Sequence, residues 1–121
     1  MRRLLPALLL LAAGPAAAQV YAVPTAFCGG SLMAMQFETV VTPGPQGRAD
    51  YRVTLRNVVN SPMRFAVQVQ GDVLGKPSGL QSLAGGQMTV LNLGYMLNAP
   101  GRMPMRNEQL ANAVRISCQA G

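Results

Sequence analysis

The sequence predicts a small all-β domain built as an antiparallel sandwich, with a small β-barrel as the alternative. Apolar and polar residues alternate with a period of two in segments that recur about every eight to twelve residues, and turns rich in glycine and proline separate these segments. Helical spacing is confined to one short segment near the end of the chain. The length of 121 residues suits one domain, because each half would be too small to stabilise itself easily.

The first two predicted strands cover residues 33–41 and 51–56, and a turn rich in proline and glycine at residues 43–47 separates them. In both strands every second residue is apolar, apart from one threonine, which is the pattern of a strand with one buried face. We therefore expect the following residues to point inward: Met33, Met35, Phe37, Thr39, Val41, Tyr51, Val53 and Leu55.

The next two predicted strands cover residues 63–70 and 87–95, with a loop at residues 71–79 between them. The earlier strand alternates strictly, and Met63, Phe65, Val67 and Val69 form its inward face. The later strand has no charged residue and has apolar side chains on both faces. A continuous apolar pattern favours a central strand that is buried on both sides.

The last predicted strand covers residues 111–119, with Val114, Ile116 and Cys118 pointing inward. Helical spacing precedes it at residues 105–113, where Asn107 could cap a single helical turn.

Residues 1–18 have the three parts of a secretory signal peptide. A cationic start at residues 1–3 precedes an apolar run at residues 4–13, and three alanines at 16–18 provide the small residues for cleavage before Gln19. A membrane anchor is the alternative, but ten apolar residues are too few to cross a hydrocarbon core of about 30 Å. We expect export by the general secretory route to the periplasm or beyond. The mature chain, residues 19–121, would form one domain that does not span the membrane.

The chain has two cysteines, Cys28 and Cys118. In an oxidising compartment an even pair predicts a disulfide. This bridge would close nearly the whole domain, and in the chain-entropy model such a loop contributes about 4–5 kcal/mol to stability. A zinc site is a poor alternative because the chain contains no histidine.

The composition also argues against an enzyme. The absence of histidine excludes Ser-His hydrolases and Cys-His proteases. The four carboxylates, Glu38, Asp50, Asp72 and Glu108, are widely spread in sequence, as expected of surface charges. The segment at residues 71–77 resembles a phosphate loop, but it has three residues rather than four between its glycines, and Pro77 stands where a hydroxyl is needed. We expect no catalytic residues and no cofactor.

Residues 51–57, 64–69 and 83–87 carry a further pattern ahead of Val90: a strand ending in Asn, a strand with aromatic-x-Val, and a turn that begins Leu-x-x-Gly. This pattern resembles that of bacterial exported immunoglobulin-like domains. Three departures stand out. Ala84 replaces a usual proline, and the chain has no tryptophan to pack on a core disulfide. The proposed bridge also joins the two ends of the chain rather than its middle strands. The resemblance implies an immunoglobulin-like sandwich and carries no activity, because this architecture hosts many unrelated functions.

The net charge of +6 falls to +4 once Arg2 and Arg3 are removed with the signal peptide, which leaves eight basic and four acidic residues. Three arginines, Arg52, Arg56 and Arg64, form a basic face if the strands at 51–56 and 63–70 form a hairpin. They solvate two separate outer faces if these strands lie in different sheets, which is common in sandwiches. Nucleic acid is not expected as a partner, because no aromatic residues interleave the basic positions.

Two functions remain. The leading expectation is an exported, non-catalytic envelope protein that binds another envelope protein or assembles with it. If the strand at 87–95 lies at a sheet edge, Leu91 and Leu93 mark it as a docking strand for a partner that adds a β-strand. The alternative is a Cu(I)-binding protein that uses the thioethers of Met96, Met103 and Met105, since thioethers are soft ligands. Hydrophobic packing of the same methionines competes with this alternative.

Overall fold

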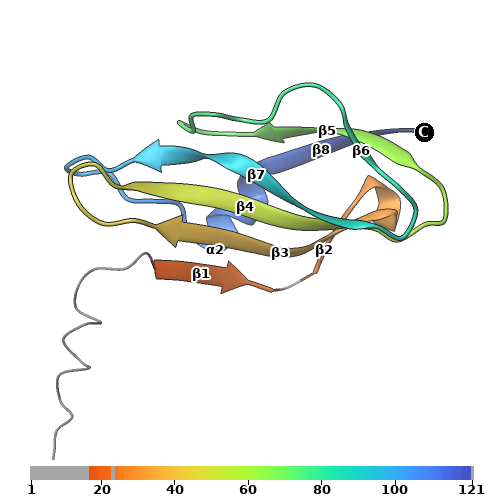
Figure 1. Ribbon diagram of the computed structural model, residues 1–121, viewed down its shortest axis with the longest axis horizontal. Coiled ribbons are helices and arrows are strands. Elements are labelled where there is room, and N and C mark those ends of the chain that lie inside the picture. Colours follow the sequence, from red (N-terminus) through yellow and green to blue (C-terminus); the bar gives the residue numbers. More distant parts are fainter. Residues whose placement is uncertain (1–16, 23, 121) are drawn as a thin grey trace, which may run out of the picture.

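A computed structural model describes residues 17–22 and 24–120, whose strands form two antiparallel sheets (Figure 1). The large sheet contains β1 (Ala17–Tyr21), β3 (Leu32–Val41), β4 (Arg48–Asn57) and β7 (Met88–Leu97) in that order, and β2 (Thr25–Phe27) also pairs with β3. The small sheet has the order β6 (Gln81–Leu83), β5 (Met63–Val69) and β8 (Val114–Ala120). The predicted all-β sandwich is confirmed, and the described strands do not close into the alternative barrel.

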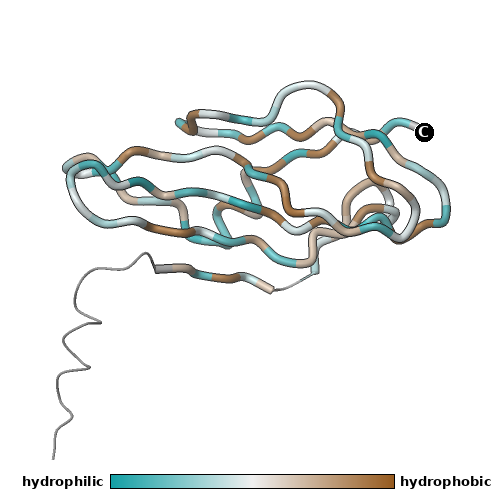
Figure 2. Tube along the Cα trace, viewed as in Figure 1, coloured by the Kyte–Doolittle hydropathy of each residue, from teal (hydrophilic) through white to brown (hydrophobic). Residues whose placement is uncertain are grey.

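The core lies between the two sheets and includes the inward faces that the alternation predicts for β4 and β5. Figure 2 shows how hydrophobic and hydrophilic residues succeed one another along the strands. The inward residues of β4 and β5 are all buried, namely Tyr51, Val53, Leu55, Met63, Phe65, Val67 and Val69. Among their outward neighbours, Arg56, Arg64 and Gln68 are exposed, whereas Arg52, Thr54 and Ala66 are half-buried.

The first half of β3 corrects the prediction. Met33 and Met35 are half-buried, whereas Leu32 and Ala34 are fully buried. The pairing of β3 with β4 shifts between Ala34 and Gln36, so one extra residue stands in β3 at this point. Such a β-bulge reverses which residues face inward. The predicted phase therefore holds only beyond the bulge, where Phe37 and Thr39 are buried.

Three short strands have no counterpart in the predictions. β1 pairs with β3 from Ala17↔Val41 to Tyr21↔Phe37, β2 pairs with β3, and β6 pairs with β5. Segments of three to five residues are too short to show a convincing period. Residues 1–16 of the expected signal peptide lie outside the described residues, so its cleavage stays a prediction.

The expected helix is present as α2 (Asn107–Ala113), but Asn107 does not cap it. The cap position is Arg106, whose backbone N–H donates to Gln109 Oε1 at 2.9 Å. Asn107 lies in the first turn and is buried, and its Oδ1 accepts a hydrogen bond from Thr39 Oγ1 at 2.8 Å. Asn107 therefore links the helix to β3 rather than capping it.

The predicted disulfide between Cys28 and Cys118 is confirmed, with a Cα–Cα distance of 5.9 Å. Cys28 begins the 3-10 turn η1 (Cys28–Gly30), which follows β2 of the large sheet, and Cys118 lies in β8 of the small sheet. The bridge therefore joins the two sheets as well as the two ends of the domain.

Candidate functional site

The apolar pattern of β7 favoured a central position, but β7 lies at an edge of the large sheet. One side of β7 pairs with β4 from Arg56↔Met88 to Arg48↔Leu97. On the other side, the part of the chain that the structure describes forms backbone hydrogen bonds with β7 only at Tyr95. There the backbones of Leu74 and Tyr95 exchange two hydrogen bonds of 2.9 Å. The segment from Met88 to Asn92 is consequently open, and we call it the docking edge.

The backbone groups at the docking edge can be assigned from the ladder. The N–H of Asn57 donates to the carbonyl oxygen of Gln87 at 2.9 Å, which places the odd-numbered residues of this part of β7 opposite β4 as hydrogen-bonded pairs. Residues in an antiparallel pair alternate, so the next residue turns its N–H and C=O the other way. The backbone groups of Met88, Val90 and Asn92 therefore face the open side.

The side chains at the docking edge differ from those that the sequence singled out. Leu93 is fully buried and Leu91 is half-buried, so both predicted docking residues point toward the core. The exposed apolar side chains are those of Val90, 61% exposed, and Met88, 53% exposed. A partner strand would therefore bond to the backbone of the even-numbered residues and cover their side chains on the outer face.

From Met88 to Asn92 the docking edge has no charge, proline or bulge, and the bulge of β7 lies just beyond it, at Leu93, where the pairing with β4 shifts between Arg52 and Tyr51. Edges are commonly blocked by charged side chains, proline, bulges or a covering loop. No charged residue occurs from residue 77 to residue 101. Within the described residues, a segment covers β7 only around Leu74. Its close approach requires glycine at position 94, because a Cβ there would overlap the Val73 side chain and the Leu74 carbonyl oxygen. Beyond Gly75, which has a φ of 65°, the chain leaves this edge and joins β5 as β6.

The three arginines proposed as a basic face are divided between the sheets. β4 and β5 do not pair, so the hairpin alternative is wrong, and Arg64 lies on the small sheet opposite Ser82 and Gln119. On the large sheet, Arg52 Nε lies 3.8 Å from Glu38 Oε1. Arg56 is exposed beside Met88, the first residue of the docking edge.

Other acidic residues of the described chain also lie beside arginines. Arg48 Nε is 3.1 Å from Asp50 Oδ1, and its guanidinium lies 4.4 Å from the centre of the Tyr95 ring. Arg102 Nη2 is 3.5 Å from Asp72 Oδ2. These pairs are exposed, so each contributes little to stability.

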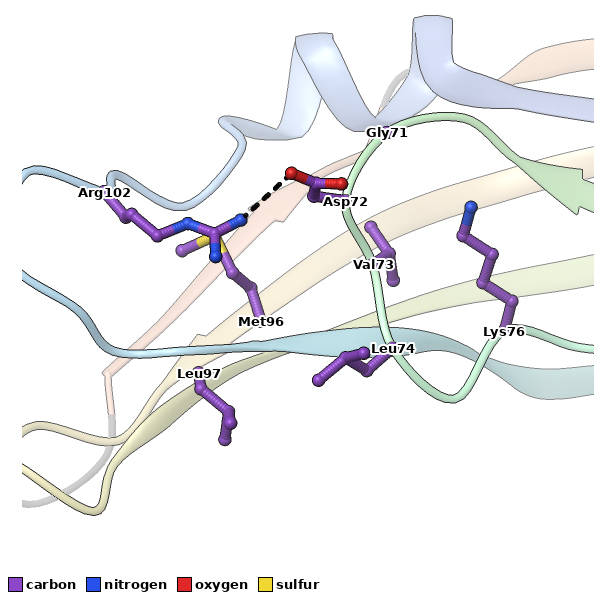
Figure 3. A pocket seen from close by; sticks show the side chains of 8 residues that line it. All are labelled: Gly71, Asp72, Val73, Leu74, Lys76, Met96, Leu97 and Arg102. Carbon is purple, nitrogen blue, oxygen red and sulfur yellow. Dashed lines mark hydrogen bonds and ion pairs between the residues drawn. The ribbon is translucent and has the colours of Figure 1, made fainter.

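A hollow lies where the segment at residues 71–76 meets the end of β7 (Figure 3). Its volume is about 450 Å³, and Val73, Leu74, Met96 and Leu97 provide its apolar lining. The Asp72–Arg102 ion pair crosses one side of it, while Lys76 extends from the other side in Figure 3. Leu74 and Leu97 are about half exposed, so this hollow is an open surface depression.

A second hollow of about 360 Å³ adjoins the first and brings together the three methionines that the sequence proposed for copper. Met103 is 84% exposed, whereas Met96 is buried and Met105 packs against the core. The Met105 N–H donates to the Tyr51 hydroxyl at 3.1 Å, which holds this loop against β4. Within the described residues, no three His, Cys, Asp or Glu side chains come together as a metal site.

No helix among the described residues is both long and apolar enough to cross a membrane. No family model matches the chain, and neither the curated proteins nor the solved structures gave a match. The resemblance to immunoglobulin-like domains therefore stays a prediction. The fold and the site define a small all-β sandwich in which the edge strand β7 is open from Met88 to Asn92.

Proposed function

We propose that this protein is an exported, non-catalytic envelope protein that binds another envelope protein by accepting a β-strand at its docking edge. The open backbone of Met88, Val90 and Asn92 carries this proposal. In strand addition, main-chain hydrogen bonds supply affinity, and side chains on the two faces of the added strand supply specificity. Here the exposed side chains of Met88 and Val90 would contact the added strand on the outer face.

The disulfide supports the proposed compartment. A bridge between Cys28 and Cys118 persists in an oxidising environment such as the periplasm or the extracellular space, and such bridges are rare in reducing compartments. The docking edge would then meet partners that are themselves exported. Strand addition needs neither a cofactor nor a catalytic group, in agreement with the dispersed carboxylates and the absence of histidine.

Site-specific crosslinking in intact cells tests the docking edge. A photoreactive residue in place of Val90 is expected to give a defined covalent adduct with another envelope protein. The same residue in place of Val20, which is 52% exposed on β1 of the same sheet, is the matched control and should give none. Equal adducts at both positions, or none at Val90, would contradict the proposal.

A second candidate function, Cu(I) binding, is favoured by the position of Met96, Met103 and Met105 around one hollow. Thioethers are soft ligands that suit Cu(I). We expect native mass spectrometry to detect one bound Cu(I) in the wild type and none in the double variant Met103→Leu, Met105→Leu, which keeps the apolar bulk. Met88→Leu, which changes an exposed methionine on the docking edge, should bind copper like the wild type. A wild type that takes up no Cu(I) would end this alternative.

A further inference from the structure

The docking edge is symmetric about its middle residue. Met88, Val90 and Asn92 face the open side at equal spacing, with Val90 at the centre. In an antiparallel pair, a hydrogen-bonded residue exchanges both its N–H and its C=O with the residue opposite. A twofold axis through Val90 would therefore let the Val90 backbones of two copies satisfy each other, while Met88 of each copy lies opposite Asn92 of the partner subunit.

The charge distribution also permits this pairing although the chain is basic. The uncharged run from residue 77 to residue 101 contains the whole docking edge, so no like charges meet directly. Arg52 is paired with Asn92 and Arg56 with Met88 in the β4–β7 ladder. Across the axis, the Cα atoms of Arg52 and of Arg56 of the partner subunit would be three strand spacings apart, or about 14 Å. The two arginines are therefore not direct neighbours across the axis, and no like charges lie opposite each other in the new strand pair.

The ends of the docking edge leave room for a second β7. At one end the chain turns away from the sheet, because the Gln87 N–H bonds back to the Ala84 carbonyl at 3.0 Å. At the other end Leu74 covers Tyr95, and Gly75 then directs the chain toward β6. Between the turn at Gln87 and the covered Tyr95, the five residues of the docking edge are open, and a second copy would pair with them through the same five residues. A symmetric pair would cover both edges at once and leave neither open.

We infer that, in the absence of another partner, two copies of this protein cover each other's docking edges by antiparallel pairing of β7 about a twofold axis at Val90. The inference rests on the docking edge of the proposed function. It adds that pairing of two copies regulates the access of an envelope partner to this edge. An envelope partner would have to displace the second copy before it could add its own strand.

Single cysteine variants of the disulfide-bonded mature protein test this register. A hydrogen-bonded antiparallel pair has a Cα–Cα distance of about 5.5 Å, which is within disulfide range. Val90→Cys is therefore expected to form a covalent dimer on oxidation. Met88→Cys should not, because the two copies of residue 88 would lie about 14 Å apart along the strands. Val20→Cys on β1 is the control for random collision. A covalent dimer of Met88→Cys or Val20→Cys in place of Val90→Cys would overturn the inference.

Sedimentation equilibrium of the unmodified protein provides the second measurement. We expect a concentration-dependent dimer whose dissociation constant rises about tenfold or more in Val90→Lys, because two lysines would then lie directly opposite each other. Val20→Lys should leave the dimer unchanged. A wild type that is monomeric at all concentrations would overturn the self-pairing alone, since the Val90 adduct with an envelope protein could still form. If the purified protein forms the dimer but crosslinking in cells gives no Val90 adduct with an envelope protein, the proposed function is overturned instead.

Discussion

Reduction of the Cys28–Cys118 disulfide is expected to lower the free energy of unfolding by about 4–5 kcal/mol. The two cysteines are 90 residues apart, so the bridge restricts almost the whole unfolded chain. In the chain-entropy model a loop of this length contributes about 4.6 kcal/mol at 25 °C. Small domains are stable by only about 5–15 kcal/mol in total, so this single bond supplies a large part of the stability.

Urea unfolding of the oxidised and reduced wild type measures this loss directly. The double variant Cys28→Ala, Cys118→Ala controls for side effects of the reductant, to which it should be insensitive. It should also match the reduced protein closely, although position 28 has a φ of 57°, which costs an alanine some strain. A difference below about 1 kcal/mol between oxidised and reduced protein would show that the bridge does not constrain the unfolded chain as the model requires.

The sequence predicted the parts of the fold where one face of a strand is buried and the other is exposed. In β4 the alternation of Tyr51, Val53 and Leu55 with polar residues has a single interpretation, and the structure confirms it. In β3 the same pattern misplaced Met33 and Met35, because a β-bulge adds a residue without leaving a mark in the composition. A bulge depends on the partner strand, which the local sequence does not specify.

The docking edge shows why a site is harder to predict than a strand. The existence of β7 was evident, but apolar residues on both faces are compatible with a central strand and with an edge that another chain covers. The structure distinguishes a central strand from an edge strand, because β7 pairs with a single strand of its sheet, β4. The long uncharged run from residue 77 was the signal available in the sequence, since most exposed edges carry charge. Met96, Met103 and Met105 likewise come together through the fold of their loop.

Asn57→Asp is the second change for which we expect a large effect, at least about 3 kcal/mol of lost stability. Asn57 is fully buried at the end of β4. Its Nδ2 donates to the carbonyl oxygens of Ser61 at 2.8 Å and Leu83 at 3.1 Å, while its Oδ1 accepts from the Val59 N–H at 3.1 Å. An aspartate places an oxygen where Nδ2 stood, so two hydrogen bonds are lost and a buried carboxylate faces two carbonyl oxygens.

The loss should be larger at pH 7 than at pH 4, because only a neutral carboxyl group can donate to one of the two carbonyls. Asn60→Asp makes the same change at an exposed position of the same connection, and it should alter stability by less than about 0.5 kcal/mol. Urea unfolding at both pH values measures the two variants. A stable Asn57→Asp protein would show that this side chain does not hold the connection in place.

The backbone of Asn57 also supports the docking edge, because its N–H donates to the Gln87 carbonyl oxygen next to Met88. If the connection after β4 loosens, the start of β7 loosens with it. The Asn57→Asp variant should therefore lose strand docking together with stability, whereas Asn60→Asp should keep both.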